Sequence, residues 1–389
     1  MKINIYPIVS SLHEKDRINK ETLKLLKELE QLSNHTFEIV DIDNFYNADL
    51  SLILIQSGGS EQLFLRQFKK FKGPYYLLTY GHNNSLAASL EILSYLKDHN
   101  LNGEVLHGSN EYIAQRIDEL ATHVKKAKYR YGVIGKPSDW LIASNVTYSD
   151  AMDRLAVQLV YIPIDEVVKY YKASKITFTN EANLNFNEKE LYKAERLHNA
   201  LKVIKEKYKL DGLTIRCFSL LNKLRTTACV SLALFNKDNV VATCEGDIAT
   251  MLTMHITNKL FNQAGFQANP SRIDVFNSKM VLAHCTLPLS MCENYDANTH
   301  FESGIGVAIK GELKQEKITI FKLSTNLKDY YVTTGTILYN LKESNLCRTQ
   351  IEIKVDDNIE YFLNRPYGNH HVIIYGDHKQ EIIDFMNSK

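Results

Sequence analysis

No stretch of this chain approaches the roughly 20 consecutive apolar residues that a helix needs to cross a bilayer. Neither sign of charge dominates, because 46 Lys and Arg residues stand against 45 Asp and Glu residues in the 389-residue sequence. The longest basic run, Lys125-Lys126-Ala127-Lys128, ends a helical pattern, where the helix dipole favours cations. The sequence therefore predicts neither a membrane partner nor a nucleic-acid partner.

Signatures of nucleotide binding and of zinc ribbons are missing as well. There is no GxGxxG or P-loop segment, which argues against a nucleotide site. The six cysteines are spaced by 12, 15, 41, 7 and 55 residues and form no CxxC pair, which argues against a zinc ribbon or a disulfide scaffold. Residues 1–9 lack the apolar region and cleavage site of a secretory signal. These absences predict a cytoplasmic protein with reduced thiols.

The first third of the chain alternates short β-rich runs with amphipathic helical stretches, which is typical of a parallel sheet covered by helices. Two glycine-containing loops, 57–60 and 135–139, follow predicted strands, at the edge where α/β sheets bind ligands. We interpret them as tight turns in a Rossmann-like layer sandwich. The predicted strands span residues 3–9, 36–40, 50–55, 75–79, 104–106 and 129–134, and the predicted helices span residues 19–32, 61–70, 85–98 and 111–126.

A second βα pattern follows, and then a succession of strands. The chain exceeds the usual size of a single core, so we predict three domains. They are a Rossmann-like α/β domain over residues 1–148, a central α/β domain over residues 149–282, and a mostly antiparallel β domain or small barrel over residues 283–389. The later elements are strands 159–162 and 212–218, helices 188–209 and 247–261, and strands 304–310, 318–323, 330–341, 349–355 and 372–375.

Polar residues that can carry chemistry concentrate in the C-terminal half. An apolar run from Val241 ends in Glu245-Gly246-Asp247, just before a predicted helix. Asp247 fits the N-cap of that helix. Glu245, at the end of a strand-like run beside glycine, lies where α/β active sites form. We therefore predict that Glu245 is functional.

Two further segments supply candidate side chains. Asp274 ends the segment 269–274 and can be a turn residue or a ligand, while His284 can be a hydrogen-bonded core histidine or a ligand. His370 and His371 precede an apolar strand, and because adjacent strand side chains face opposite ways, one of them at most points into a given site. Two carboxylates and an imidazole suit Mn²⁺ or Mg²⁺.

Five motifs in this order resemble the C-terminal half of the L-fucose isomerase and L-arabinose isomerase superfamily. The resemblance is clearest from about Thr243 to Asp377. It implies a Mn²⁺ site, with Mg²⁺ or Co²⁺ as alternatives, held by Glu245, Asp274 and His370. The motifs are Cys244-Glu245-Gly246-Asp247, Asn269-Pro270-Ser271-Arg272-Ile273-Asp274, Leu282-Ala283-His284-Cys285-Thr286, His300-Phe301-Glu302-Ser303-Gly304 and Gly368-Asn369-His370-His371.

The same resemblance implies an activity, an aldose-ketose isomerisation through a metal-stabilised enediolate. Glu245 and Asp274 would move the protons as general base and acid. It also implies a homo-oligomer, a trimer or hexamer with sites near subunit boundaries. The expected contacts to the sugar are Arg216, Arg272, His284, His300, Glu302, Asn369 and His371.

The chain is shorter than the family's enzymes, so the resemblance does not name the sugar, which can be L-fucose, L-arabinose or a modified hexose such as sulfoquinovose. Two other functions stay open. A metal-dependent sugar lyase or epimerase would use the same enediolate, and product analysis would distinguish it. A non-catalytic sugar-binding protein would bind its ligand without carboxylates at positions 245 and 274 and without a metal.

Overall fold

The computed structural model describes residues 1–46, 48–71, 73–125 and 127–388. Contacts divide the chain into two compact units, Met1–Tyr129 with Thr147–Tyr161, and Arg130–Val146 with Ile162–Lys389. The predicted domain boundaries after residues 148 and 282 stay a prediction. Lys126, in the predicted helix 111–126 and in the basic run, and Lys389, the last residue of the third predicted domain, lie outside the described residues.

The first sheet is parallel and has the strand order β2-β1-β3-β4-β5. One apolar cluster contains Leu52 and Leu54 of its central strand and the other contains Ile53 and Ile55. Such a strand is buried on both faces, which explains its continuous apolar run. Its strands are β1 Lys2–Ile8, β2 Thr36–Ile39, β3 Leu50–Ile55, β4 Tyr75–Leu78 and β5 Gly103–Leu106, and the helices between them are α1 Lys15–Leu32, α2 Glu61–Gln67, η1 Phe68–Lys70, α3 Ser85–Asp98 and α4 Asn110–Lys125.

The second sheet has the order β7-β6-β8-β9, and β8 pairs in parallel with both β6 and β9. Helix α9 is buried over nearly its whole length and α10 from Ile248 to Thr257, as expected for helices that are apolar all round. Four helices of this region, α5, α6, α8 and α9, were not predicted. The elements are β6 Tyr129–Ile134, α5 Tyr148–Leu155, β7 Val157–Ile162, α6 Ile164–Ala173, α7 Glu188–Tyr208, β8 Gly212–Ile215, α8 Phe218–Leu224, α9 Cys229–Lys237, β9 Val241–Cys244 and α10 Ile248–Phe261.

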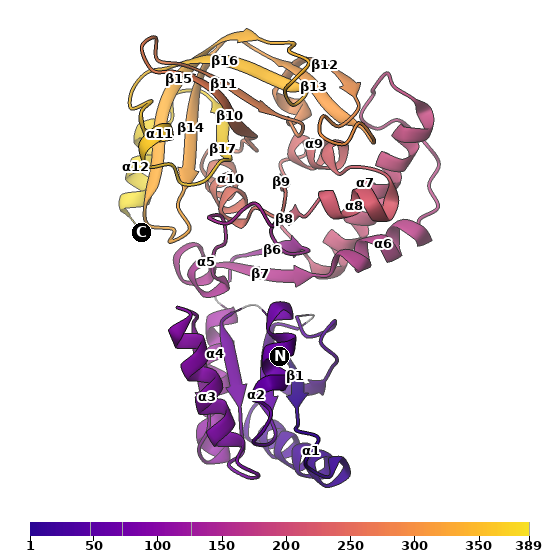
Figure 1. Ribbon diagram of the computed structural model, residues 1–389, viewed down its shortest axis with the longest axis vertical. Helices are drawn as coiled ribbons and strands as arrows, with labels where there is room; N and C mark the ends of the chain where they lie inside the picture. Colours follow the sequence, from indigo (N-terminus) through magenta and orange to yellow (C-terminus); the bar gives the residue numbers. More distant parts are fainter. Residues whose placement is uncertain (47, 72, 126, 389) are drawn as a thin grey trace. The chain divides into compact units, whose positions relative to one another are not determined.

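A closed antiparallel barrel of six strands follows, in the order β10-β11-β16-β15-β14-β17, with the pair β12-β13 beside it. Helix α10 packs against β14 and β17 (Figure 1). The predicted fold class, two parallel α/β sheets and then a β-barrel, is confirmed. The elements are β10 Phe266–Asp274, β11 Lys279–His284, η2 Leu289–Met291, β12 Cys292–Asn298, β13 Ala308–Leu313, β14 Lys317–Leu323, β15 Tyr330–Asn340, β16 Thr349–Val355, α11 Tyr361–Asn364, β17 His371–Tyr375 and α12 Lys379–Asn387.

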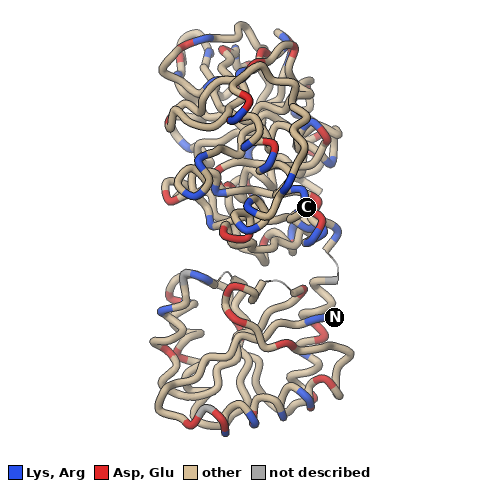
Figure 2. Tube along the Cα trace, turned by 90° about the vertical axis from the view of Figure 1, so that its right-hand side faces the viewer, with Lys and Arg blue, Asp and Glu red and all other residues tan. Residues whose placement is uncertain are grey.

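Charged residues of both signs are interspersed along the chain, as the balanced composition predicts (Figure 2). Within the described ranges, none of the helices has the length and apolar character needed for a bilayer crossing. The six cysteines are all free, as expected.

Candidate metal centre

Three buried side chains from distant parts of the sequence meet in the second unit. Glu245 directly follows β9, His284 ends β11, and His370 directly precedes β17. One ligand atom from each lies within 4.8 Å of the others. In the part of the chain that the structure describes, this is the only such group of three or more His, Cys, Asp or Glu residues. The carboxyl end of the second sheet and the end of the barrel thus share one polar site.

The turn that carries Glu245 is tight and left-handed. Glu245 has φ of 64° and Gly246 has φ of 72°, a region that costs a residue with a Cβ roughly 1–2 kcal/mol. A Cβ on Gly246 would lie 2.9 Å from the carbonyl oxygen of Lys136 and 2.9 Å from Cα of Pro137. Glycine is therefore required at position 246, and the strain at Glu245 is of the kind that accumulates at functional sites.

Each histidine of the group is oriented through its Nδ1 atom. His370 Nδ1 donates to Asp247 Oδ2 at 2.9 Å, and His284 Nδ1 hydrogen-bonds Thr286 Oγ1 at 2.9 Å. The Nε2 atoms then face Glu245 Oε1, from which His370 Nε2 lies 3.5 Å and His284 Nε2 lies 3.8 Å away. An acceptor that fixes the second ring nitrogen is the usual support of a metal-binding histidine.

Opposing effects set the charges of the group. Burial raises the pKa of Glu245, but His370 and His284 outweigh it and hold that pKa far below its usual range. Burial lowers the pKa of His370, but Glu245 and Asp247 outweigh it and raise the pKa to about 9. Asp247 keeps a pKa of about 2 despite burial, because Lys322 and His370 lie beside it. The carboxylates are therefore ionised and ready to bind a cation.

A cavity of about 20 Å³ adjoins the group, which is room for one water-sized particle. Asn269 lines it, and its buried Oδ1 atom has no hydrogen-bond partner among the described residues. His370 Nε2 also has none. A buried acceptor without a partner is costly, so Asn269 Oδ1 fits a bound cation. His370 Nε2 would bind one on losing the proton that its raised pKa keeps there. The cavity is lined by Phe218, Cys229, Cys244, Glu245, Asn269, His284, Cys285, His300, Glu302 and Cys347.

The structure does not bring Asp274 to this group. Asp274 ends β10 with an exposed side chain, and its carboxylate accepts hydrogen bonds from the backbone and side chain of Asn277. It lies five residues beyond Asn269 along one strand, which is roughly 16 Å at the usual rise. Asn269, which the sequence reasoning did not single out, occupies the end of the segment 269–274 that reaches the cavity.

The other predicted contacts divide into two groups. His300 and Glu302 line the cavity, with His300 Nε2 3.1 Å from Glu302 Oε2. Arg272 is exposed and pairs with Glu343 at 2.6 Å. The remaining predicted contacts lie outside the cluster of Glu245, His284 and His370 as well; they are Arg216, Asn369 and His371.

His371 packs beside Tyr361 and Phe362 and hydrogen-bonds the Tyr361 hydroxyl. Burial lowers its pKa to about 3. Its Nδ1 donates to the carbonyl of Asn369, whose side chain is exposed. Of the two adjacent histidines, His370 is thus the one in the group, as the strand alternation requires.

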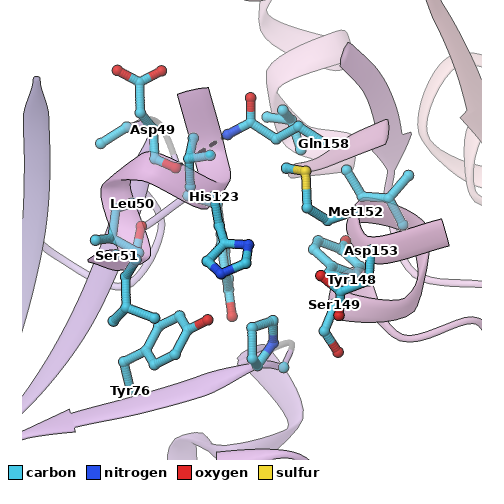
Figure 3. Close-up of a pocket in the computed structure, with 18 of the residues that line it drawn as sticks. Asp49, Leu50, Ser51, Tyr76, His123, Tyr148, Ser149, Met152, Asp153 and Gln158 are labelled. Atoms are coloured by element: carbon cyan, nitrogen blue, oxygen red, sulfur yellow. Dashed lines mark hydrogen bonds between the residues drawn. The ribbon is translucent and has the colours of Figure 1, made fainter. Parts of the chain in front are cut away.

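A larger hollow of about 290 Å³ lies within the first unit (Figure 3). Tyr76, His123 and Tyr148 line it, and Asp49 and Asp153 stand on opposite sides. The described residues around it include no cluster of metal-binding atoms. The catalytic candidate is therefore the smaller cavity of the second unit.

The fold and this geometry define a candidate divalent-metal centre at the junction of an α/β sheet and a β-barrel. No known family model matches the chain. It is 26% identical to the sulfoquinovose isomerases of Priestia aryabhattai and Priestia megaterium over 213 residues, which cover 52% of this chain and 47% of each relative. The sulfoquinovose isomerase of Alkalicoccus urumqiensis is 22% identical over 209 residues, which cover 51% of this chain and 47% of that relative. The match spans about half the length of these relatives.

The chain is thus distantly similar to sugar isomerases. This agrees with the isomerase part of the motif resemblance. Membership of the L-fucose and L-arabinose isomerase superfamily stays a prediction.

Proposed function

We propose that the chain is a metal-dependent aldose-ketose isomerase whose ligands are Glu245, His284, His370 and the amide oxygen of Asn269. The observation that carries this proposal is the orientation of the two imidazoles, each fixed at Nδ1 with Nε2 turned to Glu245. The unpartnered Oδ1 of Asn269 at the same cavity supports a fourth ligand. Asn269 and His284 replace Asp274 in this ligand set.

The donor set is one carboxylate, two imidazoles and an amide oxygen. We propose Mn²⁺, with Co²⁺ as the alternative that the second imidazole favours. When bound, such an ion polarises the carbonyl and adjacent hydroxyl of a sugar and stabilises the negative charge that develops as the C2 proton leaves.

The proton transfers need a carboxylate near the substrate, and Asp274 is too distant to supply one. Glu245 and Glu302 are the two carboxylates at the cavity. His300 lies between Ser303, which its Nδ1 contacts at 3.0 Å, and the Glu302 carboxylate. We propose that Glu302 exchanges the proton between C1 and C2, and that His300 holds its carboxylate in place.

The proposed substrate is a sulfonated hexose such as sulfoquinovose. The similarity to sulfoquinovose isomerases supports this choice, while L-fucose and L-arabinose are the alternatives from the motif resemblance. The balanced charge of the chain supports a small substrate over a polyanion.

The test is a panel of sulfoquinovose, L-fucose and L-arabinose incubated with Mn²⁺-loaded or Co²⁺-loaded enzyme, with new ketose scored by NMR. We expect ketose from one sugar with the wild type. Glu245→Gln should lower the rate at least about 100-fold, because loss of a direct ligand exceeds the usual 10- to 100-fold cost of losing its support.

Asp274→Asn is the matched carboxylate variant, and we expect it to keep the wild-type rate because Asp274 is exposed and remote. Loss of activity in Asp274→Asn would overturn the ligand set. Products with fewer carbons would indicate a lyase, and a new aldose would indicate an epimerase. Sugar binding that persists without metal and without ketose would indicate a binding protein.

A further inference from the structure

The chain has a single tryptophan, and it contacts the candidate metal centre. Trp140 follows β6 in the loop of residues 135–141 and is 51% exposed. Its indole Nε1 donates to Glu245 Oε2 at 2.5 Å. The other carboxylate oxygen, Oε1, faces His284 and His370. The two oxygens of Glu245 therefore have different partners, and the indole N–H fixes which one faces the cavity.

The loop that carries Trp140 is fastened to the Glu245 turn. Ser138 N donates to the carbonyl oxygen of Glu245 at 2.9 Å. The close approach of Gly246 to Lys136 and Pro137 leaves no room for a side chain between loop and turn. The backbone and side chain of Glu245 are thus both held by the same short loop.

Arg216, which was predicted to contact the sugar, holds this loop through its side chain. Its Nη1 donates to the carbonyl oxygen of Pro137 at 2.8 Å, and its guanidinium forms two hydrogen bonds, of 3.2 and 2.6 Å, with the carboxylate of Asp139. A bidentate pair of this kind fixes both position and angle. Arg216 follows β8, so the loop is tied to the neighbouring strand of the sheet.

The ring of Trp140 packs against Phe218, which lines the cavity. The two rings lie edge to face with their centroids 4.8 Å apart, and the centroid of the Phe218 ring lies 5.4 Å from that of the His300 ring. A cavity of about 20 Å³ has room for an ion but not for a hexose. On the proposed function the sugar therefore lies outside this cavity, and the half-exposed ring of Trp140 beside Phe218 offers apolar surface to such a ligand.

We propose that Trp140 is a positioning residue for Glu245 and that its ring packs against the C–H face of the sugar. The proposal rests on the proposed function, because it takes Glu245 as a ligand. Without the indole N–H, the carboxylate can rotate and present its oxygens to the metal less often. Without the ring, the sugar also loses apolar contact. These two losses are separable by substitution.

The first measurement uses the wild-type protein, in which Trp140 is the only tryptophan and its emission reports this loop alone. Titration with Mn²⁺ and with diamagnetic Zn²⁺, followed by calorimetry on the same samples, should change the emission in step with binding of either ion. His370→Gln should abolish both signals. Binding by calorimetry without any emission change would overturn the proposal, whereas absence of binding would overturn the proposed function itself.

The second measurement separates the N–H from the ring. Trp140→Phe should weaken metal binding and lower kcat by about 10-fold each, the usual effect of losing a group that supports a ligand, with KM changed less than about twofold. Trp140→Leu should additionally raise KM by about fivefold. Phe276→Leu, at a fully exposed aromatic outside the site, should leave metal affinity, kcat and KM unchanged.

Arg216→Gln provides an independent route to the same result, because it releases the loop without altering Trp140. Like Trp140→Phe, it should lower the metal affinity. Wild-type metal affinity and kcat in both Trp140→Phe and Arg216→Gln would refute the positioning role. Equal KM values in Trp140→Phe and Trp140→Leu would refute the packing of the sugar on the ring.

Discussion

Asp247 has three roles at the residue scale. Its side chain accepts from Thr250 N at 2.8 Å, which confirms the predicted N-cap of α10. The same carboxylate accepts from His370 and lies 3.8 Å from the buried Lys322. One carboxylate therefore begins a helix, fixes the tautomer of a candidate ligand and balances a buried lysine.

Asp247→Asn should lower metal affinity about 10- to 100-fold, because the amide holds the His370 imidazole less firmly than the carboxylate does. Asparagine is an equally good N-cap, so the helix itself should persist. Calorimetry at fixed pH measures the affinity, and the exposed Asp16→Asn serves as the matched control.

The single variant leaves the buried Lys322 without its charge partner, which lowers stability. The double variant Asp247→Asn with Lys322→Met removes both charges, so any loss of metal affinity that remains comes from His370 and not from lost stability. It should bind metal as weakly as Asp247→Asn while recovering unfolding free energy. Unchanged affinity in Asp247→Asn would show that His370 needs no support from this carboxylate.

At the element scale, helices α7 and α9 are joined by a buried histidine. His198 of α7 contacts Ser231 of α9 through Nδ1 at 2.8 Å, and its ring lies 4.7 Å from Phe235. Burial, with a smaller effect of Lys202, lowers the pKa of His198 to about 4. The folded protein therefore keeps this imidazole neutral under conditions in which the unfolded chain protonates it.

This difference predicts a pH dependence of stability. Between the unfolded pKa of about 6.5 and the folded pKa of about 4, the unfolded state binds more protons, so stability falls as pH falls. The contribution is full above about pH 6.5 and lost below about pH 4, and it amounts to about 3 kcal/mol. Urea unfolding across this range should show a smaller slope for His198→Gln than for wild type.

His99→Gln, at an exposed histidine, is the control and should keep the wild-type slope. An identical slope in His198→Gln and wild type would mean that the imidazole between α7 and α9 does not titrate differently in the two states.

At the scale of the whole molecule, the candidate metal centre connects two architectures. Glu245 belongs to the second sheet, while His284 and His370 belong to strands of the barrel or their ends. All three lie in the second unit. A metal bound there therefore stabilises the sheet and the barrel together. The predicted trimer or hexamer stays a prediction.

Mn²⁺ at 100 times its dissociation constant should stabilise the folded second unit by about 2.7 kcal/mol, which corresponds to a rise of roughly 5 °C in its melting temperature. Tryptophan emission follows this unit, because Trp140 lies in it. EDTA should reverse the shift, and His370→Gln should not show it. A shift of equal size in His370→Gln would place the metal elsewhere.

The sequence by itself determined most of the elements and most of the candidate site. Periodicity predicted the parallel sheets, because strands buried on both faces have continuous apolar runs. The end of a strand-like run singled out Glu245, because polar residues at the carboxyl ends of strands occupy the usual site of α/β folds. The motif resemblance added His370 as a ligand, and His284 was a candidate ligand or core histidine. These features depend on local pattern, which a single chain displays directly.

Only the tertiary structure decided which neighbours of those residues reach the cavity. Asp274 and Asn269 stand in one strand, and the barrel's register brings Asn269 beside β11's end while Asp274 lies at the other end in solvent. Trp140 was not singled out, and Arg216 was predicted only as a contact to the sugar, because their contacts to Glu245 and to the loop join segments far apart in sequence. Contacts of this kind depend on strand register and loop packing, which local sequence patterns do not specify.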